Sequence, residues 1–150
     1  MAGFANAPLA IAVYQAGGLG FVGSADDTSA LSEKLSQIEN AVPRHDGLLP
    51  IGVGFLPFIA KREEALPVLN RYHPAAVWLF AAKHVSDYAT WVEGIRNQSP
   101  GSQVIIQVGS VSTALQIAQE AHPDALCIQV STLAVTGLKR VLALPHSSLK

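Results

Sequence analysis

The sequence alternates short apolar runs with segments of helical period, and this alternation limits the fold more than any other feature. Five runs rich in β-branched or aromatic residues begin near positions 19, 49, 76, 103 and 125, so that consecutive starts lie 22 to 30 residues apart. The runs cover residues 19–22, 49–55, 76–80, 104–108 and 125–129. Each is short enough for one strand and apolar at successive positions, which predicts strands buried on both faces, as in a parallel sheet.

The segments between the runs carry apolar residues at the 3.6-residue period of a helix. One helical face joins Leu31, Leu35, Ile38 and Val42, a second joins Val85, Tyr88, Val92 and Ile95, and a third joins Val111, Ala114, Leu115, Ala118 and Ala121. Two further helices are expected over residues 8–16 and 58–72, the second with a kink or break at Pro67. This alternation predicts an α/β fold with parallel strands, as either a doubly wound sheet or a TIM (β/α)8 barrel.

Composition and charge exclude several classes of protein. Every hydrophobic run is interrupted before it reaches the roughly 18 residues of a membrane span, and the start of the chain lacks the basic segment and long apolar core of a secretory signal. The single cysteine, Cys127, excludes an internal disulfide and a cysteine-based metal site. With 10 basic and 11 acidic side chains, the chain has no field that attracts nucleic acid. We expect an intracellular, cytoplasmic enzyme or binding domain for a small molecule, with neither nucleic acid nor membrane as a partner.

The charges divide the chain near position 130. All 11 acidic residues lie at or before Asp124, whereas three of the 10 basic residues, Lys139, Arg140 and Lys150, follow Gln129. Residues 1–129 therefore carry 7 − 11 = −4, and residues 130–150 carry +3. We interpret residues 1–129 as the domain and residues 130–150 as an aberrant C-terminal tail.

Residues 18–23, Gly-Leu-Gly-Phe-Val-Gly, match the spacing of the dinucleotide-binding fingerprint. In that fingerprint the glycines follow a strand and open a helix, which places pyrophosphate at the helix N-terminus. Here they follow a predicted helix and enter a predicted strand. We interpret them as the end of a helix and a close approach between helix and strand.

Two glutamines end otherwise apolar predicted strands, Gln107 and Gln129. The carboxyl ends of parallel strands are where α/β folds place their sites, and a carboxamide both donates and accepts hydrogen bonds, which suits the N–C=O edge of a flavin or a similar heterocycle. The alternative is that loop backbone satisfies both side chains, and the residues leave the two possibilities open. His84 follows a predicted strand closely, and we interpret it as a solvated residue ahead of a helix.

Five segments, in order from Met1 to about Gln129, resemble the nitronate monooxygenase family and are most similar to its fungal members. They are MAGFANAPLAIAVYQAGGLGFVGS, LPIGVGF, VWLF, VIIQVGS and PDALCIQ. The resemblance implies an FMN-bound TIM barrel that oxidises alkyl nitronates to a carbonyl compound and nitrite with O2. It also implies that the backbone of Met1, Ala2 and Gly3 lies against the flavin and that Gln107 and Gln129 face it. Gly54 stands where many relatives place an asparagine.

The chain also departs from the family pattern. Met1 falls inside the family's first strand, and no Gly-Gly-His follows Gln129, so no residue is assigned to catalysis. Val130-Ser131 is compatible with the codons of a splice donor, which makes residues 130–150 a possible translated intron. We expect roughly the first six βα positions of a barrel, without the last two βα units, which supply the family's FMN phosphate site. Such a partial barrel cannot close, so we expect open sheet edges and self-association.

Three functions remain open at this stage. The first is FMN-dependent nitronate oxidation by the chain itself. The second is a non-catalytic fragment of that family. The third is a free-standing flavodoxin-like module that binds flavin.

Overall fold

Strands and helices alternate through residues 5–24 and 27–129, the part of the chain that the computed structural model describes. The strands are β1 (Phe21–Ser24), β2 (Leu49–Phe55), β3 (Pro74–Phe80), β4 (Gln103–Val108) and β5 (Ala125–Ile128). The helices are α1 (Ala7–Gln15), α2 (Thr28–Glu39), α3 (Arg62–Tyr72), α4 (Val85–Gln98) and α5 (Val111–Glu120). The five predicted strands and the five predicted helices are therefore all present, with shifts of a few residues at their ends.

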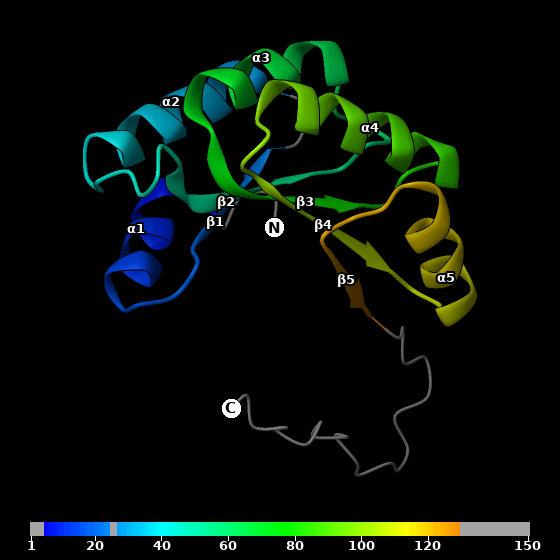
Figure 1. The fold of residues 1–150 in the computed structure, drawn as a ribbon. Coiled ribbons are helices and arrows are strands. Elements are labelled where there is room, and N and C mark those ends of the chain that lie inside the picture. The colour runs from blue at the N-terminus through cyan, green and yellow to red at the C-terminus, as the bar shows by residue number, and fades with distance from the viewer. Residues whose placement is uncertain (1–4, 25–26, 130–150) are drawn as a thin grey trace, which may run out of the picture.

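The strands form one parallel sheet in the order β1-β2-β3-β4-β5. A doubly wound sheet reverses its strand order at a switch point and carries helices on both faces. Here every crossover moves in the same direction, and right-handed crossovers then place all helices on one side. Figure 1 shows the helices as an arc around one face of the sheet. The fold is the expected partial TIM barrel, and the flavodoxin-like alternative is wrong.

The main core lies between the sheet and the helices. Alternate strand residues that face the helices are fully buried, namely Val22, Val53, Val77, Leu79, Val104 and Ile106. The residues between them, such as Phe21, Trp78 and Ile105, are only partly buried, and Phe80 is exposed. The expected burial on both faces is thus confirmed in full on the helix-facing side. On the inner face small residues such as Gly52, Gly54 and Ala76 are buried, but the large side chains are not, because no described layer covers them.

The glycine-rich segment ends α1 and lets β1 pass close to it. Gly17 has a φ of +84°, and the N–H of Gly18 donates to the Val13 carbonyl at 2.9 Å, which closes the helix. A Cβ on Gly20 would overlap the backbone of Ala10. Both parts of the interpretation from sequence, a helix end and a close helix-to-strand contact, are confirmed.

Two helices differ from their predictions. Helix α3 begins at Arg62, and Pro67 lies inside it without ending it, because Ala65, Leu69 and Tyr72 stay buried on one face. On the predicted face of α5, Ala114 and Ala121 are buried as expected, but Val111 and Leu115 are 65% and 62% exposed, and Ile117 is buried in their place. The reason is position: α5 packs against α4 and the last two strands, and no described helix lies on its other side.

Several expectations lie outside the described residues, namely those for Met1, Ala2 and Gly3 and for the tail at 130–150. Within the described part, β1 and β5 each pair with one strand, so the sheet has two edges there, and self-association through them stays a prediction. None of the described helices has both the length and the apolar character needed to cross a membrane.

Replacing Gly20 by alanine should destabilise the protein by about 1–3 kcal/mol, because the new methyl group would force α1 away from β1. The free energy of unfolding, measured by denaturant titration, checks this. Gly109→Ala is the matched control, since a Cβ there would meet its nearest neighbour, the Gln129 carbonyl oxygen, at 3.8 Å. Equal stability of the two variants would contradict the proposed close contact.

Candidate functional site

A cavity of about 420 Å³ lies at the carboxyl ends of the strands, on the face of the sheet away from the helices. Its volume falls within the usual range for small-molecule sites, about 300–1,000 Å³. The carboxyl ends of barrel strands are also where TIM-barrel enzymes bind their ligands. The lining residues are Phe21, Gly23, Ser24, Gly54, Phe55, Leu56, Trp78, Phe80, Gln107 and Gln129.

The register of the sheet brings these side chains together. Gly54 is the partner of Trp78 across β2 and β3, and Phe80 is the partner of Gln107 across β3 and β4. Because side chains alternate between faces, residues two apart on a strand share the inner face. Glycine on β2 beside tryptophan on β3 leaves a hollow with an aromatic wall.

The aromatic wall has a fixed geometry. The rings of Phe21 and Trp78 lie edge to face, with centroids 5.4 Å apart and an interplanar angle of 89°. The Phe21 ring occupies the space that a Cβ on Gly52 would take. The glycine at position 52 therefore allows Phe21 to lie across the sheet against Trp78.

A chain of hydrogen bonds crosses three strands beside this wall. The indole Nε1–H of Trp78 donates to Oε1 of Gln107 at 3.1 Å, and Nε2 of Gln107 donates to Oε1 of Gln129. The backbone N–H of Gln129 donates to the Val108 carbonyl at 2.8 Å, which holds this residue beside the end of β4. Two carboxamides thus form the polar part of an otherwise apolar cavity.

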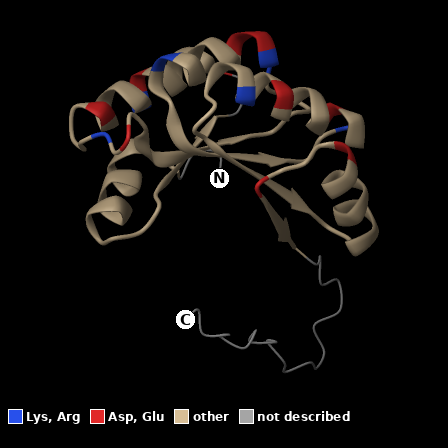
Figure 2. Ribbon diagram, viewed as in Figure 1, with Lys and Arg blue, Asp and Glu red and all other residues tan. Residues whose placement is uncertain are grey.

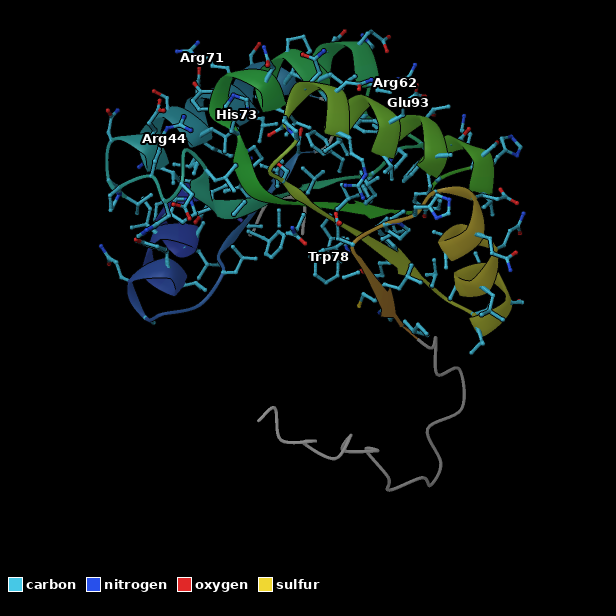
Figure 3. All side chains as sticks on the ribbon, viewed as in Figure 1. Arg44, Arg62, Arg71, His73, Trp78 and Glu93 are labelled. Carbon is cyan, nitrogen blue, oxygen red and sulfur yellow. The ribbon has the colours of Figure 1, made fainter. Side chains whose placement is uncertain are left out.

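The lining residues that the structure describes include no Asp, Glu, Lys, Arg or His. Figure 2 shows that the charged residues lie on the helices and loops, and none of the described strands contains one. In Figure 3, Trp78 points to the inner side of the sheet, whereas Arg44, Arg62, Arg71, His73 and Glu93 lie on the helical side. The cavity is therefore suited to a flat, mostly apolar ligand with a few polar atoms. Its described side chains cannot serve as a general acid or base.

The structure places the predicted site residues as follows. Gln107 and Gln129 both line the cavity and bond to each other and to Trp78, rather than to loop backbone. Gly54 also lines the cavity. His84 precedes α4, where its backbone N–H donates to the Asp87 carboxylate at 3.0 Å, and it is not among the lining residues, which agrees with the interpretation of it as the start of a helix.

The sequence analysis missed the aromatic lining residues Phe21, Trp78 and Phe80. The signal was available in the strand period: Trp78 and Phe80 are two apart, and Phe80 ends β3 as Gln107 nearly ends β4. What the sequence lacked was the register, which decides the face of each strand that points inward.

A parallel sheet with helices on its outer face and an apolar cavity at the strand carboxyl ends defines the class, a TIM-barrel-type α/β protein. By sequence, the chain is 38% identical over 130 residues to nitronate monooxygenase npaC of Metarhizium robertsii, covering 81% of this chain and 36% of that protein. It is 29% identical over 149 residues to a nitronate monooxygenase of Neurospora crassa, covering 86% and 35%. These matches confirm the predicted family resemblance: the chain is related to the N-terminal part of the nitronate monooxygenases, and it spans about a third of these relatives.

Solved structures give the same fold. FabK from Thermotoga maritima superposes with a TM-score of 0.66 at 25% sequence identity, covering 84% of this chain and 37% of that one. Its M276A mutant superposes with a TM-score of 0.67, covering 84% and 39%. These neighbours are TIM barrels, which confirms the partial barrel. No family model matches the chain.

Replacing Gly52 by alanine should displace the Phe21 ring from Trp78, because the new methyl group would occupy the position of that ring. The ring is half-buried and can turn into the cavity, so we expect a change at the site with little loss of stability. The measurement is the NMR resonance of the Trp78 indole N–H, with Trp91 as an internal reference. Gly101→Ala is the control, because a Cβ there would meet only the end of Leu48. An unmoved Trp78 resonance would refute this packing.

Proposed function

We propose that the inner face of this sheet binds the flavin ring of FMN and forms the flavin side of a nitronate-oxidising active site. The observation that carries the proposal is the cavity itself, with aromatic walls and two linked carboxamides at the strand carboxyl ends. The sequence similarity to nitronate monooxygenases supports the reaction that we propose. This reaction is the oxidation of alkyl nitronates by O2 to a carbonyl compound and nitrite.

The residues present fit a flavin. Its ring system is flat and aromatic, and its pyrimidine edge carries alternating donors and acceptors. Phe21, Trp78 and Phe80 supply apolar aromatic surface. Gln107 and Gln129 supply carboxamide groups that can hydrogen-bond to the polar edge of the ring.

FMN bound here would supply the electron transfer from the nitronate to O2, which is chemistry that the protein side chains cannot supply. The aromatic walls would exclude water from the flavin ring. Gln107 and Gln129 would hold the edge of that ring by hydrogen bonds. A nitronate is already an anion, so the first step does not require a base at this wall.

We also propose that the backbone of Met1, Ala2 and Gly3 lies against the flavin. The support comes from the next described residues: the carbonyl of Ala5 accepts a hydrogen bond from the N–H of Gly23, a lining residue, at 3.2 Å. Ala5, which precedes α1, therefore lies beside a residue that lines the cavity. A short backbone segment there would bring N–H groups to the ligand without a bulky side chain.

A non-catalytic relative that binds flavin is the second candidate. The observation that favours it is that no Gly-Gly-His of the family pattern follows Gln129 in the sequence. Such a protein would bind FMN as the first candidate does. It would not turn over nitronate.

The first test is FMN binding by the purified chain, followed as a change in flavin absorbance. Gln107→Leu should weaken binding by about tenfold, since it removes hydrogen bonds that contribute about 0.5–1.5 kcal/mol each. Gln103→Leu is the matched control, because Gln103 lies on the same strand at its other end and does not line the cavity. Equal weakening in both variants, or no binding by the unmodified chain, would count against a flavin site.

The second test separates the two candidates by oxygen uptake with propyl nitronate. For the 150-residue chain by itself we expect uptake no faster than with free FMN, because no Gly-Gly-His of the family pattern follows Gln129 in the sequence. Uptake well above that background would overturn this expectation and establish nitronate oxidation by the chain.

A further inference from the structure

Trp78 determines which way the two cavity carboxamides point. An indole N–H can only donate a hydrogen bond, so the group of Gln107 that lies 3.1 Å from it must be the carbonyl oxygen. The NH2 group of Gln107 then faces Gln129. Because that NH2 group can only donate, Gln129 must present its own carbonyl oxygen in return.

The hydrogen bonds therefore run in one direction, from Trp78 to Gln107 to Gln129, and the series ends in the NH2 group of Gln129. Among the described residues, no hydrogen bond is recorded for that NH2 group. Each bond in such a series polarises the next, which strengthens the donor at its end. Trp78 lies on β3, Gln107 on β4 and Gln129 directly after β5, so the hydrogen bonds follow the order of the strands across the cavity wall.

The series is anchored at one end and open at the other. Trp78 is partly buried and held edge to face by Phe21, whereas Gln129 is exposed. A side chain that is packed on one side keeps its rotamer, and a carboxamide without such a neighbour can turn over. The indole is thus the fixed point that sets the orientation of both carboxamides.

We infer that Trp78 is a positioning residue. Its indole N–H orients Gln107 and, through it, Gln129, so that the NH2 group of Gln129 is the donor offered to a ligand. The part of the ligand that contacts Gln129 must then be a hydrogen-bond acceptor. An acceptor of this kind is a carbonyl oxygen or an unprotonated ring nitrogen. A ligand that places only donors against Gln129 is disfavoured, because a donor would then face another donor. That the ligand is FMN rests on the proposed function. The orientation of the carboxamides does not depend on it.

The test is a double-mutant cycle on FMN affinity with Trp78→Phe and Gln107→Met. Phenylalanine keeps an aromatic ring and removes the N–H, so we expect the dissociation constant to rise about three- to tenfold. In the Gln107→Met background the same change should alter affinity less than twofold, because the indole acts through Gln107. An equal loss in both backgrounds would show that Trp78 matters only as apolar surface and would overturn the inference, as would no loss in either.

A second measurement needs no ligand. In the free protein, Gln107→Met should shift the Trp78 indole N–H resonance and speed its exchange with water, while the Trp91 resonance stays in place. Gln103→Met is the control and should leave both resonances unchanged. If the unmodified chain does not bind FMN, the proposed function fails and this measurement still decides the orientation. An indole resonance that is insensitive to Gln107→Met refutes the series of hydrogen bonds whether or not FMN binds.

Discussion

The packing of helices against one face of the parallel sheet is the constraint on which the rest of the molecule depends. Side chains such as Val53, Val77 and Val104 are removed from water only if they all point to the helices. Since neighbours along a strand alternate, that requirement also decides which residues point the other way. The cavity residues Trp78 and Gln107 lie on the inner face because Val77 and Ile106 must lie on the outer one.

Much of the fold follows from the sequence, because its signals are local. The apolar runs that became β2 and β3, and the 3.6-residue period of α4, give strands and helices directly. The glycines at 17 and 20 also carry a local meaning, as a helix end and as a close approach. Local signals fail where a neighbour decides burial. The apolar stripe on α5 includes Leu115, yet Leu115 is exposed because no described element lies beside it.

For the same reason, only part of the candidate site could be predicted from the sequence. Gln107 and Gln129 are polar residues at the ends of apolar strands, and such positions can be found without a structure. Phe21, Trp78 and Phe80 are as apolar as the core and cannot be told from it until the register fixes their face. The link between Trp78 and Gln107 joins residues 29 positions apart, and only the pairing of β3 with β4 brings them together.

The two carboxamides have a consequence for how such a cavity responds to its surroundings. Neither Gln107 nor Gln129 gains or loses a proton between the acid and alkaline limits at which proteins unfold, and no other described lining residue does so either. The polarity of the wall is thus independent of pH. Any pH dependence in the occupancy of this cavity has to come from the titration of the ligand, or of protein groups outside the described lining.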